Sequence, residues 1–127
     1  TEQKAYREAI SSYEKALEGD RHLFYRLLIY YNLGYLYELS GQYEKGVEYF
    51  QKITMFNKKR VLFWTVGQRP NSFWLFSAYF GIGRCQEKLN RFSEAKEMYL
   101  RIVDEFPETP FSDKAEALAL LLTSKQK

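Results

Sequence analysis

The sequence has few of the side chains that enzymes and metal sites commonly use. Its 127 residues include a single histidine, His22, and a single cysteine, Cys85. One cysteine cannot form an internal disulfide, a redox pair or a thiolate metal cage. With one histidine, a Ser-His-Asp or Cys-His pairing could arise only by chance, and the usual three-ligand metal sites lack ligands. The stretch "GIGRCQ" has Gln86 where a dinucleotide motif needs its third glycine. We therefore expect no enzymatic activity, no metal and no other cofactor, with the glycines and Cys85 serving as packing positions.

Long apolar runs and targeting segments are also missing. No stretch of about 18 apolar residues predicts a membrane span, and no signal or transit peptide is recognisable. The chain does not begin with methionine, which we interpret as a sign that it is a fragment of a larger protein. Aromatic residues, in contrast, make up 18% of the chain. Large rings suit helix interfaces and binding surfaces equally well.

Acidic residues are absent from the middle of the chain. No Asp or Glu occurs from Tyr49 to Gln86, whereas eight acidic residues precede this span and eight follow it. The net charge of +3 is too small to predict nucleic-acid or membrane binding by itself. The positive charge is nevertheless local, because the acid-free span contains Lys52, Lys58, Lys59, Arg60, Arg69 and Arg84.

Three segments of the chain share one pattern and align without gaps. They are "YREAISSYEKAL" from Tyr6, "YEKGVEYFQKIT" from Tyr43 and "FSEAKEMYLRIV" from Phe92. The matched positions are spaced by three, four and three residues, which places them on one face of a helix. In each segment a small residue lets a neighbouring helix approach closely, and an aromatic ring four positions later covers that helix. These pairs are Ala9 and Tyr13, Gly46 and Phe50, and Ala95 and Tyr99.

A second shared pattern precedes two of these segments. The stretches "YYNLGYLYELSGQY" and "YFGIGRCQEKLNRF" match in an aromatic, an aliphatic residue and a glycine at helical spacing. Gly41 and Asn90 follow, where the C-terminus of a helix favours a residue that tolerates positive φ. Each unit is therefore predicted to be a helix, a tight turn and a second helix.

These units resemble the tetratricopeptide repeat (TPR) family. The family's columns are occupied by Tyr30, Leu33, Gly34, Tyr37, Gly46, Phe50 and Ile53 in one repeat, and by Tyr79, Ile82, Gly83, Gln86, Ala95, Tyr99, Ile102 and Pro107 in the next. Gln86 replaces the usual tyrosine, and Lys58 replaces the terminal proline of the first full repeat. The resemblance implies an all-α, right-handed array of antiparallel helix pairs.

The resemblance divides the chain, as a single TPR domain over residues 1–127, into five parts. We expect the second helix of a truncated repeat at 1–18, full repeats at 22–57 and 72–107, an insertion at 58–71 and a C-terminal capping helix at 109–125. Thr109 can cap this last helix, and Pro110 suits its first turn. The wording "EFPETPFSDKAEAL" also resembles repeat junctions of bacterial cell-envelope TPR proteins. It favours the bacterial envelope, in the periplasm or at a membrane, with the cytoplasm as the alternative.

The insertion is the main departure from the family's register. Gly34 and Gly83 are 49 residues apart, against about 34 in the family, which leaves a surplus of about 15. Its aromatic and basic residues could fold back as a small core on the second full repeat. They could instead form a partner-binding patch, because tryptophan and arginine are enriched at interface hot spots. The residues of this patch would be Arg60, Phe63, Trp64, Arg69 and Trp74.

The resemblance further implies a concave face, lined by the first helices of the repeats, that binds a partner. Its columns hold Leu28, Tyr31, Tyr35, Glu38 and Leu39, then Phe80, Arg84, Glu87 and Lys88, and finally Lys114 and Leu118 on the last helix. The Lys and Asn residues with which chaperone-binding members clamp a terminal carboxylate are missing. An aromatic groove suits an apolar or helical protein segment, although any of these tyrosines could instead be core.

The predicted function is accordingly a non-catalytic scaffold that binds another protein, peptide or helix and no small-molecule substrate. One alternative is an envelope or membrane-proximal adaptor that uses the insertion as a lipid contact, with membrane contact also arising through the rest of a larger protein. A second alternative is an RNA-binding helical repeat, in which the rings would stack on bases. The modest charge disfavours nucleic acid.

Overall fold

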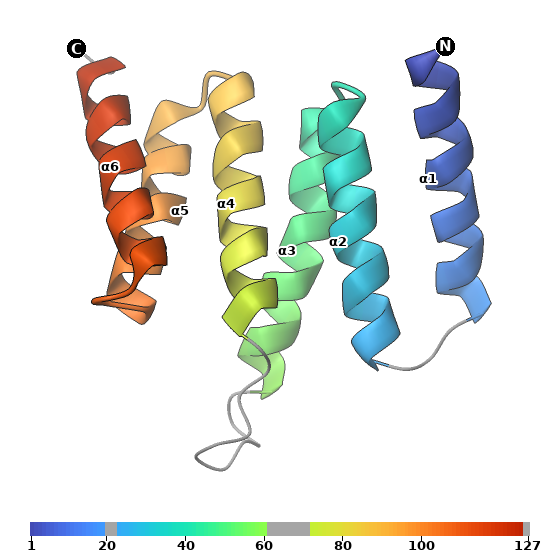
Figure 1. Ribbon diagram of the computed structural model, residues 1–127, viewed down its shortest axis with the longest axis horizontal. Helices are drawn as coiled ribbons and strands as arrows, with labels where there is room; N and C mark the ends of the chain where they lie inside the picture. The colour runs from blue at the N-terminus through green and yellow to red at the C-terminus, as the bar shows by residue number, and fades with distance from the viewer. Residues whose placement is uncertain (20–22, 61–71, 126–127) are drawn as a thin grey trace.

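The computed structural model describes residues 1–19, 23–60 and 72–125, and these form six α-helices and no strand. Helices α2, α4 and α6 form the nearer layer in Figure 1, α3 and α5 lie behind them, and α1 stands at one end beside α2. The predicted all-α helical array is therefore confirmed. The helices are α1 Glu2–Gly19, α2 Leu23–Leu39, α3 Tyr43–Arg60, α4 Ser72–Lys88, α5 Phe92–Glu105 and α6 Pro110–Lys125.

Each helix packs on the helix that follows it in the chain, and α2 also contacts α4. Helix α2 thus lies between α1 and α3, and α4 lies between α3 and α5. Helix α3 extends through Arg60, three residues into the segment that the sequence assigns to the insertion. Helix α4 begins at Ser72, so that Phe73, Trp74 and Phe76 are helical.

The turns within the two helix pairs have the predicted geometry. Gly41 and Asn90 have φ angles of 84° and 61°, in the left-handed region. The amide of Gln42 donates to the carbonyl of Tyr37 at 2.8 Å, and Arg91 donates to Gln86 at the same distance. These bonds close a Schellman motif, which satisfies carbonyl groups at the end of the first helix and reverses the chain.

The start of α6 also follows the sequence prediction. The amide of Ser112 donates to Oγ1 of Thr109, and the amide of Thr109 donates to Oγ of Ser112, both at 3.1 Å. This reciprocal arrangement satisfies two amides that would otherwise lack partners at a helix N-terminus. Pro110 is the first residue of the helix, where a backbone N–H group has no partner within the helix, so the missing N–H of proline costs nothing.

Glycines allow the helices to approach closely around the buried rings. The ring of Phe50 on α3 lies between Gly34 on α2 and Gly81 on α4. A Cβ atom added to Gly34 would lie 2.9 Å from this ring, and one added to Gly81 would lie 2.5 Å from it. Gly83 is covered in the same way by Tyr99 of α5. These glycines are therefore packing positions, as the sequence indicates.

The buried side chains form three clusters that follow one another along the array. The first joins α1 and α2 around Leu33 and Tyr37. The second joins α2, α3 and α4 around Phe50 and Ile82, and the third joins α4, α5 and α6 around Tyr99. The core thus follows the array in sequence order, and each repeat packs on its immediate neighbours.

Candidate partner-binding face

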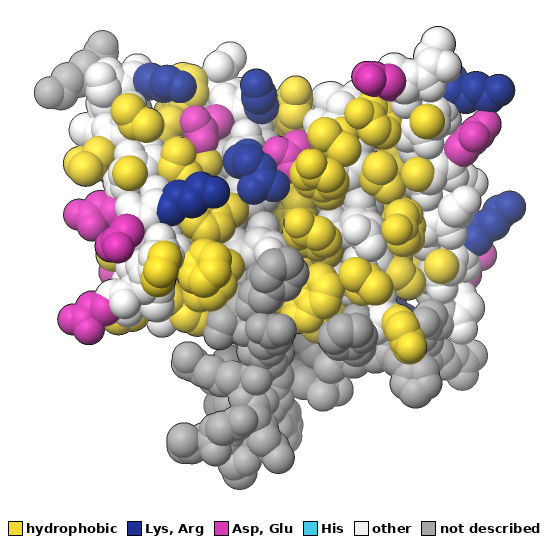
Figure 2. All heavy atoms as spheres, in the orientation of Figure 1, with side chains coloured by type: hydrophobic (Ala, Val, Ile, Leu, Met, Phe, Trp, Pro, Cys, Tyr) yellow, Lys and Arg dark blue, Asp and Glu magenta, His cyan; other side chains and the backbone are white. Residues whose placement is uncertain are grey.

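The outer sides of α2, α4 and α6 form one surface, which we call the front face. Figure 2 shows that hydrophobic side chains gather over these helices, with basic and acidic side chains next to one another near the middle. The predicted groove residues all lie on these three helices. They differ, however, in how far their side chains are exposed.

Helix α2 contributes an exposed apolar row to the front face. Leu28, Tyr35 and Leu39 are exposed, and the exposed fraction of Tyr35 is 42%. Tyr31 is half-buried, and its ring lies parallel to that of Tyr35 with a centroid separation of 6.4 Å. Helical spacing places these side chains on one side of α2, while its other sides pack on α1, α3 and α4.

An ion pair links the two repeats next to this row. The Nε atom of Arg84 on α4 donates to Oε2 of Glu38 on α2 at 2.8 Å, and Nη2 donates to Oε1 at 2.9 Å. The hydrogen bond to Glu38 raises the pKa of Arg84, so its guanidinium group stays charged. Two parallel hydrogen bonds of this kind fix the relative orientation of the two side chains as well as pairing their charges. The sequence analysis names both residues as groove residues but does not predict that they pair. Their opposite charges on neighbouring first helices were the signal that could have indicated the ion pair.

The half of the front face nearer to α6 is more closed. Phe80 is only 7% exposed, because it belongs to the cluster between α4, α5 and α6 and because the ammonium group of Lys114 lies 5.0 Å from its ring centroid. Glu87 accepts a hydrogen bond from the hydroxyl of Tyr99. Lys88 is exposed, and Leu118 is half-buried. Phe80 is therefore core beneath the face and does not present its ring to solvent.

The residues predicted for the insertion patch have different positions. Trp74 lies on α4, is 8% exposed and packs in the cluster with Leu27 and Phe50, with its ring edge-to-face to Tyr31 at 6.0 Å. The interpretation of Trp74 as an exposed partner contact is corrected accordingly. Its spacing from Ala78, Ile82 and Cys85 along one helix side was the signal for burial. Arg60 ends α3, but its side chain lies outside the described part of the structure, as do Phe63, Trp64 and Arg69.

Cys85 is buried in the cluster between the two repeats. Burial and, secondarily, the nearby Glu38 carboxylate raise the pKa of its thiol to about 12. The side chain therefore stays protonated at neutral pH and behaves as a small apolar residue. This agrees with its predicted packing role.

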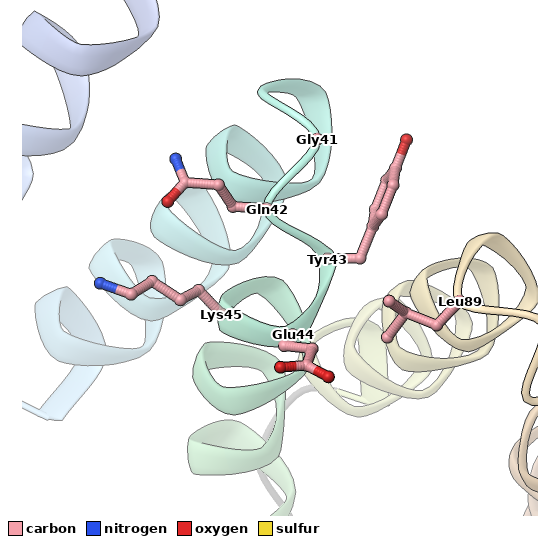
Figure 3. A pocket seen from close by; sticks show the side chains of 6 residues that line it. All are labelled: Gly41, Gln42, Tyr43, Glu44, Lys45 and Leu89. Carbon is pink, nitrogen blue, oxygen red and sulfur yellow. The ribbon is translucent and has the colours of Figure 1, made fainter.

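A shallow pocket lies at the turn between α2 and α3. It is lined by Gly41 to Lys45 and by Leu89. Figure 3 shows the Tyr43 ring and Leu89 on one side, with Gln42 and Lys45 directed away from them. Glu44 in its wall binds Arg91 at 2.7 Å. The pocket is thus the joint between two repeat turns, and its lining brings together no set of side chains suited to catalysis.

Two further features are missing from the described ranges. None of the helices there is both long enough and apolar enough to cross a membrane. Nor do three or more His, Cys, Asp or Glu side chains come together there in a way that could hold a metal ion.

The paired helices, their tight turns and the exposed face of the first helices define the chain as a helical-repeat protein. Residues 27–60 and 77–109 each match a sequence profile described as tetratricopeptide repeat. The chain belongs to the tetratricopeptide repeat family, whose members generally mediate protein–protein interaction. No curated protein and no solved structure shows a significant match to it. The bacterial envelope assignment stays a prediction.

Proposed function

We propose that this domain is a non-catalytic scaffold that binds a segment of another protein across the front face. The exposed row on α2 carries the proposal: Leu28, Tyr35 and Leu39 remain open to solvent although the other sides of the same helix are covered. Exposed rings and leucines that lie together are typical of surfaces that bind protein partners.

The partner that fits this row has apolar side chains along one side. Either a helix with leucine-like residues three and four positions apart or an extended segment could supply them. The guanidinium of Arg84 is already held by Glu38 through two hydrogen bonds. It is therefore not expected to clamp an acidic tail, and specificity should come mainly from apolar contacts.

Site-specific photocrosslinking tests this proposal directly. A photoreactive phenylalanine analogue at position 35 should capture a partner from native lysate, because Tyr35 lies in the middle of the α2 row. The matched control is the same analogue at position 100, where Leu100 is exposed on α5, outside the front face. Excess unmodified protein should compete with the first capture.

A second variant separates specific binding from stickiness. Replacing both Tyr35 and Leu39 with serine should abolish competition while leaving the far-ultraviolet circular dichroism unchanged, because both side chains are exposed. Equal capture from positions 35 and 100, or full competition by the double variant, would remove the front face as the binding surface.

The membrane and RNA alternatives depend on the insertion, most of which lies outside the described residues. For the membrane adaptor, flotation with anionic liposomes should be lost when Lys58, Lys59, Arg60 and Arg69 are changed to Glu. For RNA binding, a gel shift should weaken strongly as salt is raised. An unchanged flotation or the absence of a salt-sensitive shift would exclude the corresponding alternative.

A further inference from the structure

The ion pair between Glu38 and Arg84 presents mainly its basic member to solvent. The side chain of Arg84 is 41% exposed, whereas that of Glu38 is 15% exposed. Both carboxylate oxygens of Glu38 already accept hydrogen bonds from the guanidinium group. The carboxylate is therefore covered, and a group that lies against this pair from the front meets the guanidinium group of Arg84.

Glu38 uses only one edge of this guanidinium group. Arginine can donate from the edge formed by Nε and Nη2 and from the edge formed by Nη1 and Nη2. The first edge holds Glu38, and the second has no hydrogen-bond partner among the described residues. Because two parallel hydrogen bonds restrict the rotation of both side chains, Arg84 is a preorganised donor with one open edge.

The open edge borders the exposed row on α2. Glu38 directly precedes Leu39 and follows Tyr35 by about one helical turn, so the ion pair lies alongside the row near its C-terminal end. A segment that covers the row with apolar side chains brings its own backbone close to Arg84. A backbone carbonyl group that is buried there needs a donor, because leaving it unpaired costs free energy. A carboxylate fits this place less well, because the charge of Glu38 would repel it.

The next repeat boundary has no equivalent of this donor. Glu87 on α4 occupies the column that Glu38 occupies on α2. On α6 the column of Arg84 holds Leu118, whose side chain cannot donate, and Glu87 accepts its hydrogen bond from Tyr99 within its own repeat. In the described part of the front face such a fixed arginine donor thus occurs once, between α2 and α4. A single donor of this kind can set where along the face a bound segment lies, while the apolar row supplies most of the affinity.

We propose that the open edge of Arg84 donates to a backbone carbonyl group of the segment that binds the front face. Glu38 is then the positioning residue that holds this edge in place. The inference rests on the proposed function and deepens it, because it names a group that the face recognises besides apolar side chains. In a helical segment the carbonyl belongs to the C-terminal turn, where carbonyl groups lack partners within the helix, and in an extended segment it can lie anywhere.

A backbone scan of the captured segment tests this contact. The segment that crosslinks to the photoreactive analogue at position 35 is identified by mass spectrometry and synthesised as a peptide. In a series of analogues one amide at a time is replaced by an ester, whose carbonyl oxygen is a weaker acceptor. At one position the ester should weaken binding in calorimetry by about fivefold, as expected for the loss of one hydrogen bond.

Variants of the protein show whether this effect depends on Arg84. Glu38→Leu with Arg84→Met replaces the pair by apolar side chains of similar size without changing the net charge, which is often neutral for stability, and circular dichroism checks the fold. This double variant should bind the amide and the ester equally well. Glu38→Leu alone should reduce the difference between them, because Arg84 is present but no longer held. Lys88→Met is the matched control: it removes a positive charge from an exposed side chain one turn further along α4 and should keep the full difference.

The possible failures of this test are distinguishable. If the double variant still discriminates against the ester, or if no ester position is sensitive to Arg84, this inference is wrong and the proposed function stands. The same holds if Arg84 instead couples to an acidic side chain of the peptide, which Asp→Asn and Glu→Gln analogues detect. If position 35 captures no segment at all, the proposed function and this inference fail together.

Discussion

Replacing Gly81 with alanine would place a methyl group against the ring of Phe50. The added Cβ would lie 2.5 to 2.7 Å from three carbons of this ring, whereas favourable contacts between carbon atoms occur at about 3.5 to 4.0 Å. The ring cannot move away easily, because Gly34 lies close to it on the other side and because Phe50 is fully buried. The backbones of α3 and α4 would therefore have to separate.

Two opposing effects determine the size of the change. Overpacking of this kind costs about 1 to 3 kcal/mol. Alanine in place of glycine inside a helix returns up to about 1 kcal/mol. We expect a net loss of about 1 to 2 kcal/mol in the free energy of unfolding, and a fall in Tm of about 5 °C. Urea unfolding followed by circular dichroism measures the first quantity.

Gly19→Ala provides the matched control, because a Cβ atom there would meet nothing within 4 Å. This variant should be as stable as the original chain or slightly more stable. The Gly81→Ala cost should also shrink when Phe50 is changed to leucine, since contacting residues do not act additively. If Gly81→Ala proves at least as stable as the original chain, the idea that close packing selects this glycine is refuted.

Four shorter predictions concern other positions. Thr109→Ala should lower the free energy of unfolding by about 1 kcal/mol in urea titrations, because the cap of α6 is lost. Gln86→Leu should leave the stability unchanged or raise it by about 1 kcal/mol, because Oε1 of this buried side chain has no hydrogen-bond partner in the described part of the chain. Cys85 should react with a thiol reagent at pH 8 only as fast as the protein unfolds, since burial raises its pKa to about 12. Burial and the Glu105 carboxylate raise the pKa of Tyr79 from 10.0 to about 12. The stabilisation that depends on its protonated hydroxyl should therefore be complete below pH 10 and be lost as the pH rises from about 10 through about 12, which equilibrium unfolding at several pH values measures.

The features that could be predicted from the sequence are those set by short-range rules. Gly41 and Asn90 end their helices because few residues tolerate positive φ, and Thr109 caps α6 through an amide three residues away. The repeat columns add long-range information, because equivalent residues occupy equivalent packing sites. The columns alone therefore assign Phe50 and Tyr99 to helix interfaces.

Contacts between repeats follow no such rule, because they depend on how far one helix shifts along its neighbour. Glu38 and Arg84 are 46 residues apart, and no family column requires their pairing. Phe80 was expected to face the groove, but α6 packs close enough to cover its ring. In each case the outcome depends on the position of the neighbouring helix.

The position of Trp74 separates the aromatic residues that support the front face from those that are exposed on it. Its ring contacts Tyr31, and Tyr31 in turn stacks on the exposed Tyr35. Trp74 therefore supports the front face from within the core. Substituting Trp74 should disturb the packing of the core, and with it any binding by the front face, whereas substituting the exposed Tyr35 should leave the fold intact. A loss of partner capture identifies a contact residue only where the stability of the fold is unchanged, and the exposed residues of the α2 row are expected to meet that condition.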